Sequence, residues 1–167
     1  LALHRLDVVL SDRPAPTNPN LKLYSHDLGS SAIAWYGTAA LVDAAKASFP
    51  HSLRDTPVLL ATAHTAVREQ LDHWFERHDL RPRVVGEFED SALLKTFGAS
   101  GMGLFPATEW VRQDLLSRYG VHRLAPCEGV TERFFAIGTE RKVRHPLVQR
   151  LLRPPLHDSL APVTVPL

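Results

Sequence analysis

Three groups of polar residues in this sequence have types and spacings suited to binding a small ligand. Glu87, Glu89 and Asp90 stand close together, followed by Ser91, after a short apolar run. Carboxylate and hydroxyl oxygens are the ligands that hard cations such as sodium, calcium and magnesium require. Crowded carboxylates also raise one another's proton affinity, so this group could respond to sodium or to pH. The alternative is that Asp90 caps a helix and both glutamates are solvated.

The second group is Thr62, His64 and Thr65, in a loop of small residues just before the strongest predicted helix. Backbone N–H groups at a helix N-terminus attract an anion or a small polar ligand, and two hydroxyls and an imidazole add further contacts. An ordinary capping turn is the alternative, and the two roles can coexist. Asp12 and Arg13 form the third group, directly after an apolar run, and their alternative is a turn-stabilising pair.

A catalytic centre or a zinc site is not expected. The nine histidines include no His-Glu-x-x-His pattern, and the single cysteine, Cys127, cannot form a Cys-x-x-Cys pair. His73 and His78 are five residues apart, and the glycine-bearing loops 29–31 and 98–103 match neither a phosphate loop nor a dinucleotide fingerprint. We therefore predict that the protein is not an enzyme, that it has no metal centre and no cofactor, and that Cys127 is an inert thiol.

The elements that would position these groups alternate between apolar runs and helical periodicities, as in a mixed sheet covered by helices. The clearest helix follows Thr65, its predicted N-cap, and carries one apolar stripe from Val67 to His78. Pro106 is expected to end the pairing of its strand. The expected strands are 8–10, 32–36, 58–60, 83–85, 101–105, 121–124 and 134–138. Two further helices are expected over 39–47 and over 107–119, the second ending at Gly120. Another is expected to be capped by Asp90 or Ser91 and to end at Gly98, and the last to begin at Pro146.

Composition narrows the class of protein. The chain has 167 residues, 44% of them hydrophobic, and a net charge of +1. Its 19 basic residues are dispersed among 18 acidic ones, whereas a DNA-binding face needs clustered positive charge to neutralise phosphates. No apolar run approaches the roughly 18 residues that span a bilayer, and the first residues do not resemble a secretory signal. We expect a cytoplasmic protein without a membrane partner.

The order of elements predicts an α/β fold in two lobes. Residues 30–129 form one doubly wound lobe, and residues 1–14 with 130–153 form part of the other. Residues 15–29 are the expected crossover, rich in proline, and residues 154–167 are an expected flexible tail. Ligands of such hinged folds bind in the cleft at the carboxyl ends of the strands.

Several motifs, taken in order over roughly residues 3–152, are similar to those of LysR-type transcriptional regulators. The stretch 85–93, taken with 7–12, resembles the branch that activates a sodium/proton antiporter gene. The motifs are Arg5-Leu6-Asp7-Val8-Val9-Leu10, Phe49-Pro50-His51-Ser52-Leu53, Leu71-Asp72-His73-Trp74-Phe75, Phe97-Gly98-Ala99 and Arg133-Phe134-Phe135-Ala136-Ile137.

The resemblance implies a two-lobed periplasmic-binding-protein-like fold of type 2, with the first lobe incomplete in this fragment. It implies a homo-oligomer, a tetramer in full length, that contacts DNA only through a missing amino-terminal domain. A small effector or cation in the interlobe cleft would favour one lobe angle by population shift. The alternative is the solute-binding domain of a transport system. The residues expected at the effector site are Asp12, Arg13, Thr62, His64, Thr65, Glu87, Glu89 and Ser91.

Overall fold

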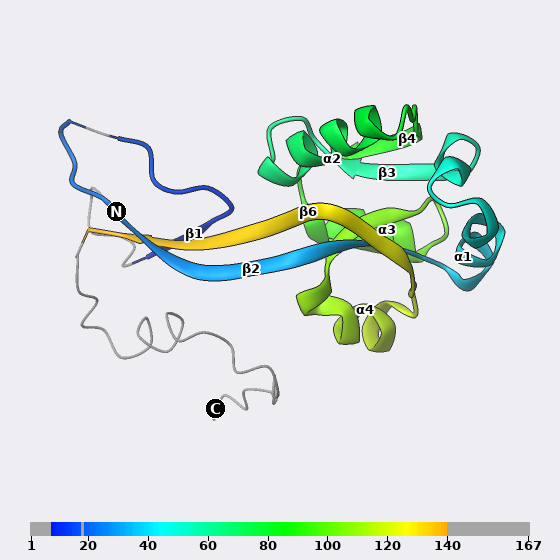
Figure 1. Cartoon of the computed structure of the whole chain (residues 1–167). Coiled ribbons are helices and arrows are strands. Elements are labelled where there is room, and N and C mark those ends of the chain that lie inside the picture. Colours follow the sequence, from blue (N-terminus) through cyan, green and yellow to red (C-terminus); the bar gives the residue numbers. More distant parts are fainter. Residues whose placement is uncertain (1–7, 18, 140–167) are drawn as a thin grey trace, which may run out of the picture. The chain divides into compact units, whose positions relative to one another are not determined.

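The computed structural model describes residues 8–17 and 19–139 (Figure 1). They fall into two compact units, which we call the large unit, Ser30–Arg133, and the small unit, made of the described residues of Leu1–Gly29 and Phe134–Leu167. The helix predicted at Pro146 and the tail predicted over 154–167 lie outside the described residues.

Two long strands run through both units, β2 (Tyr24–Gly37) and β6 (His122–Gly138). The prediction of separate short strands on either side of residues 125–133 was therefore wrong, and part of the expected crossover is also strand. Gly29 and Gly129 suggested loops, but both lie inside a strand, with φ of 106° and 77°. Glycine adopts such angles without strain, so it can bend a strand without ending it.

The strands form two sheets. One has the order β1-β6-β2-β5 and the other pairs β3 with β4 in parallel. Leu104 joins them, since its carbonyl accepts from Leu59 N at 2.8 Å and its N–H donates to the Pro57 carbonyl at 2.8 Å. Gly103 permits this approach, because a Cβ there would lie 2.9 Å from the Pro57 oxygen. The remaining strands are β1 (Val9–Ser11), β3 (Pro57–Ala61), β4 (Arg83–Phe88) and β5 (Phe105–Thr108).

The position of Pro106 corrects a second prediction. It does not end a strand but lies within β5, opposite Trp35 of β2. Because β5 is the outer strand of its four-stranded sheet, the missing N–H of a proline is tolerated there. The strand expected over 101–105 accordingly begins only at Phe105.

The residues that cap the helices are largely those that the sequence predicted. Thr65 accepts a hydrogen bond from Arg68 N, Asp90 accepts from Ala92 N and Leu93 N, and Gly120 ends its helix with φ of 62°. The helix predicted from residue 107 begins later, after a 3₁₀ turn, Glu109–Val111. The α-helices are α1 (Ala39–Ala45), α2 (Ala66–Arg77), α3 (Ser91–Ala99) and α4 (Arg112–Tyr119).

Two apolar clusters pack on opposite faces of the strands of the large unit. Trp35 belongs to one cluster and its neighbour Tyr36 to the other, and Leu59 and Leu60 divide in the same way. Successive side chains of a strand point to opposite faces, so both faces of this sheet are core. Residues of α2 contribute to the first cluster and residues of α3 and α4 to the second, and Figure 1 shows α2 and α4 on opposite sides of β2 and β6.

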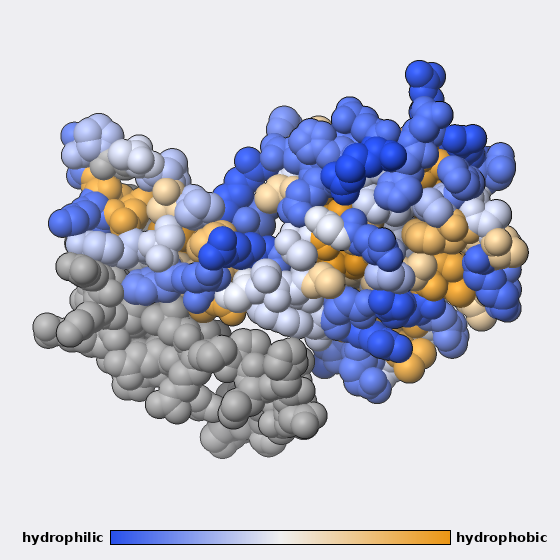
Figure 2. Space-filling model, viewed as in Figure 1, coloured by the Kyte–Doolittle hydropathy of each residue, from blue (hydrophilic) through white to orange (hydrophobic). Residues whose placement is uncertain are grey.

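Exposed apolar side chains on the large unit occur on several elements, among them Leu93 of α3 and Leu116 of α4. Figure 2 shows orange patches separated by a predominantly hydrophilic surface. No helix among residues 8–17 and 19–139 is long and apolar enough to cross a membrane.

Candidate ligand site at the strand ends of the large unit

The parallel pairing of β3 and β4 brings two of the predicted groups together. Ala61, the last residue of β3, is in register with Phe88, the last residue of β4. Thr62 N donates to the Phe88 carbonyl at 3.0 Å, so the loop after β3 begins against the segment that carries Glu87 and Glu89. Both groups therefore stand at one edge of the β3–β4 sheet, beside the N-terminus of α2.

The loop 62–65 is a compact capping turn. The Thr65 hydroxyl accepts from Arg68 N at 3.2 Å and lies 3.4 Å from the Thr62 carbonyl, to which Thr65 N also donates at 3.4 Å. The capping role of Thr65 is thus confirmed. His64 is exposed in the same loop, next to the positive end of the helix dipole.

Arg68 is the central charged residue of this edge, and the sequence analysis missed it. Its Nη1 lies 2.6 Å from Glu87 Oε1 and 2.7 Å from the Ala61 carbonyl, and its Nε lies 2.9 Å from Asp72 Oδ1. Only 14% of the Arg68 side chain is exposed. Burial alone would lower the pKa of Arg68, but its hydrogen bonds to Asp72 and Glu87 outweigh this and raise the pKa, so the guanidinium remains charged.

The acidic group is divided among different partners. Glu87 is paired with Arg68, whereas Asp90 Oδ1 accepts from Ala92 N at 2.6 Å and from Leu93 N at 3.0 Å. Glu89 and Ser91 are exposed. In the described part of the chain, no three histidine, cysteine or acidic side chains gather as metal ligands would. The helix cap expected as the alternative for Asp90 is therefore present, and Glu87 is held by an ion pair rather than simply solvated.

The third group belongs to the small unit. Asp12 and Arg13 follow β1, and Arg13 N donates to the Ser11 hydroxyl at 3.1 Å, which forms a tight turn. Asp12 is half-buried and Arg13 is exposed. The turn is held by the Ser11 hydroxyl and the Arg13 backbone, so both interpretations of the Asp12 and Arg13 side chains stay predictions.

Cys127 is 2% exposed, and burial raises its pKa to about 12. Because a thiolate is the reactive form of cysteine, a buried thiol with a raised pKa is expected to be unreactive.

Parallel strands whose carboxyl ends meet a helix N-terminus, in a sheet covered by helices on both faces, are features of many α/β folds, and solved structures assign this chain to the periplasmic-binding-protein-like fold of type 2. Residues 1–153 match the LysR substrate binding domain family, and the chain belongs to this family. It is 30% identical over 151 residues to the transcriptional activator protein NhaR of Escherichia coli (strain K12) and to that of Shigella flexneri. The alignment covers 90% of this chain and 49% of each relative, so the chain spans about half of their length.

Solved structures with the same fold confirm the predicted fold class. The cofactor-binding domain of the Cbl transcriptional regulator has a TM-score of 0.66 at 17% identity, with 87% of this chain and 64% of that chain covered. The effector binding domain of QuiR in complex with shikimate has a TM-score of 0.62 at 12% identity, covering 90% and 70%. The CcmR regulatory domain of Synechocystis PCC6803 in complex with 2-PG has a TM-score of 0.59 at 17% identity, covering 90% and 72%.

Proposed function

We propose that the chain is the effector-sensing domain of a LysR-type transcriptional activator that acts on DNA through a separate amino-terminal domain. The family supports a regulatory ligand-binding role, and the relatives that span twice this length are named transcriptional activators. The alternative, a solute-binding domain for transport, shares the fold but not this family.

The observation that carries the proposal is the position of Arg68 beside the turn 62–65. A nearly buried guanidinium and the positive end of α2 stand at the same strand edge. An effector with a carboxylate or another strong acceptor would meet this positive charge and compete with Glu87 for Arg68. Thr62, His64 and Thr65 would contact it from the turn, and Glu89 and Ser91 from the segment after β4. Asp12 and Arg13 of the small unit stay predictions.

Binding of such an effector would replace the ion pair between Arg68 and Glu87 by one between Arg68 and the effector. This exchange would favour one conformation of the edge of the β3–β4 sheet. An effector changes an equilibrium only by its differential affinity for the two states. A shift of a few kcal/mol is sufficient for a large change in activity.

The test uses the full-length regulator and two matched arginines. Arg68 pairs with Asp72 and Arg118 pairs with Asp114, both at i,i+4 on a helix, but the Arg118 side chain is 75% exposed. Chromatin immunoprecipitation identifies the promoter that the protein occupies, and a transcriptional reporter for this promoter measures activation. We expect Arg68→Met to lose activation while the protein still occupies DNA, and Arg118→Met to retain it. Absence of DNA occupancy would support the transport alternative, and full activation by Arg68→Met would contradict the assigned site.

A second candidate is a response to sodium or pH. It is supported by the resemblance of residues 85–93 to the antiporter-activating branch and by the position of Glu87 and Glu89 at the strand edge. A sodium ion or a proton bound by Glu87 would remove its ion pair with Arg68 and so favour the same change in conformation of the strand edge. The ion pair itself opposes cation binding at Glu87, because the cation would have to displace Arg68.

A further inference from the structure

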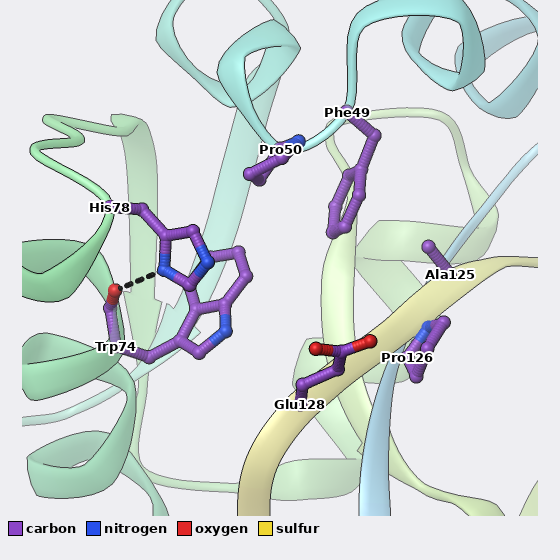
Figure 3. A pocket seen from close by; sticks show the side chains of 7 residues that line it. All are labelled: Phe49, Pro50, Trp74, His78, Ala125, Pro126 and Glu128. Atoms are coloured by element: carbon purple, nitrogen blue, oxygen red, sulfur yellow. Dashed lines mark hydrogen bonds between the residues drawn. The ribbon is translucent and has the colours of Figure 1, made fainter.

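A pocket of about 280 Å³ lies within the large unit at the C-terminal end of α2 (Figure 3). Its walls come from α2, from the turn after α1 and from the middle of β6. They include Phe49, Pro50, Trp74, His78, Pro126 and Glu128.

This pocket is separate from the strand-edge site. Thr65 and Arg68 stand at the first turn of α2, whereas Trp74 and His78 stand at its last turn and its C-cap. A helix of this length extends about 18 Å at about 1.5 Å per residue. A ligand small enough for this pocket therefore cannot also reach the strand edge.

The indole of Trp74 supplies an unused hydrogen-bond donor. Trp74 is 2% exposed, and its Nε1 is buried without a hydrogen-bond partner among the residues that the structure describes. Buried indole N–H groups normally have a partner. Figure 3 shows the indole nitrogen on the side of the ring that faces Glu128. Because the nitrogen itself has almost no exposed surface, an acceptor from the pocket would satisfy this donor by displacing the side-chain atoms that cover it.

Aromatic faces surround the same space. The ring centroids of Phe49 and His78 lie 6.1 Å and 4.4 Å from that of Trp74. His78 Nδ1 lies 2.8 Å from the Trp74 carbonyl, which can only accept, so Nδ1 carries the proton. In the neutral ring, Nε2 is then an acceptor. Aromatic faces of this kind attract cations through their quadrupoles.

Glu128 gives the pocket its charge. In Figure 3 its carboxylate lies between the Trp74 indole and Pro126, below the ring of Phe49. Within the described residues it has neither a hydrogen bond nor an ion pair. No lysine or arginine lines the pocket. The guanidinium of Arg77 lies beside Gly129, 3.8 Å from where a Cβ would stand, and does not enter the walls.

We infer that this pocket is a second ligand site, for a small organic ammonium compound. The protonated amine binds the Glu128 carboxylate and the aromatic faces, a hydroxyl or carbonyl oxygen accepts from Trp74 Nε1, and a compact apolar body packs on Phe49 and Pro126. An anion is repelled by Glu128. The volume lies at the lower end for small-molecule sites and excludes bulky ligands.

Three matched probes test the charge preference without any substitution. Phenylalaninol carries an ammonium, a hydroxyl and a phenyl group, 3-phenylpropan-1-ol lacks only the ammonium, and 3-phenylpropanoate is an anion of similar size. Each is titrated into the ¹⁵N-labelled full chain while the indole N–H signals of Trp35, Trp74 and Trp110 are followed after triple-resonance assignment. We expect phenylalaninol to shift the Trp74 signal saturably and to bind at least about fivefold more tightly than the alcohol. The signal of the partly exposed Trp110 stays unchanged.

Two exposed glutamates provide the matched variants. Glu128→Gln is expected to abolish the preference for phenylalaninol over the alcohol, whereas Glu76→Gln, which does not line the pocket, retains it. Equal affinities for the three probes, a Trp74 signal that does not respond, or an unchanged preference in Glu128→Gln would each overturn the inference. Binding that persists in Arg68→Met separates this site from the strand-edge site, and loss of phenylalaninol binding in that variant would contradict their separation.

Discussion

The side-chain amide of Gln70 pairs with the backbone of Thr131 through two hydrogen bonds. Gln70 Nε2 donates to the Thr131 carbonyl at 2.7 Å, and Gln70 Oε1 accepts from Thr131 N at 3.0 Å. The amide thus binds β6 as the peptide group of a neighbouring strand would. Because Gln70 belongs to α2, this pairing fixes on β6 the helix that carries Arg68.

Removing this pairing should destabilise the large unit. Gln70→Ala is expected to lower the free energy of unfolding by about 1–3 kcal/mol, since each of two hydrogen bonds contributes about 0.5–1.5 kcal/mol. Gln113→Ala, at an exposed position of α4, is the control and should change stability little. Urea unfolding followed by circular dichroism measures both variants. Equal midpoints for Gln70→Ala and the unchanged chain would show that the pairing contributes nothing.

The acidic residues of the strand edge are tested in the full-length regulator. If the sodium response is real, Glu87→Gln with Glu89→Gln abolishes sodium-dependent activation while the fold is retained. Asp90 is left unchanged, because its helix cap contributes about 1 kcal/mol to stability. The measurement is reporter transcription against added sodium chloride, with potassium chloride as the ionic-strength control. A preserved sodium response would place the sensor elsewhere, and equal responses to both salts would exclude specific sodium sensing.

The thiol of Cys127 should be unreactive in the folded chain. Burial raises its pKa from 9.0 to about 12, so the folded state holds the proton more tightly than the unfolded state does. The resulting contribution to stability is complete below pH 9 and is lost as pH rises toward about 12. Ellman's reagent should react only after denaturation in guanidinium. Cys127→Ala should lose less stability over that alkaline range than the unchanged chain, and rapid labelling of the native thiol would contradict the assignment.

Self-association is expected to involve α1 and the segment 108–119. Val111 packs against the chain's own core, whereas Trp110, 36% exposed, and Leu116, 47% exposed, are the large apolar residues of this segment available to another copy. Leu116→Glu should weaken association of the full-length protein, measured by sedimentation equilibrium. Leu93→Glu, at a residue 52% exposed on α3, is the control. A strictly monomeric unchanged protein, or equal weakening by both variants, would count against this surface.

The features that local sequence determines were predictable. The hydroxyl of Thr65 and the carboxylate of Asp90 cap helices within three residues of themselves, so their roles follow from spacing alone. The role of Arg68 was not predicted because one of its partners, Glu87, is on β4, 19 residues further along the chain, and only the register of β3 with β4 brings them together. The i,i+4 spacing of Arg68 and Asp72 was a signal that the sequence offered.

The long strands were missed for a related reason. Gly29 and Gly129 have the local chemistry of turns, and the pairing of β2 with β6 outweighs it. The same holds for Pro106, whose position in an outer strand depends on the order of the whole sheet. Such features depend on tertiary neighbours that no window of sequence contains.

The division of successive residues of β2 between two cores limits how this chain can change in length. Inserting one residue before Trp35 would turn its indole toward the cluster that now holds Tyr36, and would turn Tyr36 the other way. Both cores would then receive side chains of the wrong shape at once. Evolutionary insertions and deletions should therefore accumulate in the connecting loops and be excluded from residues 33–36.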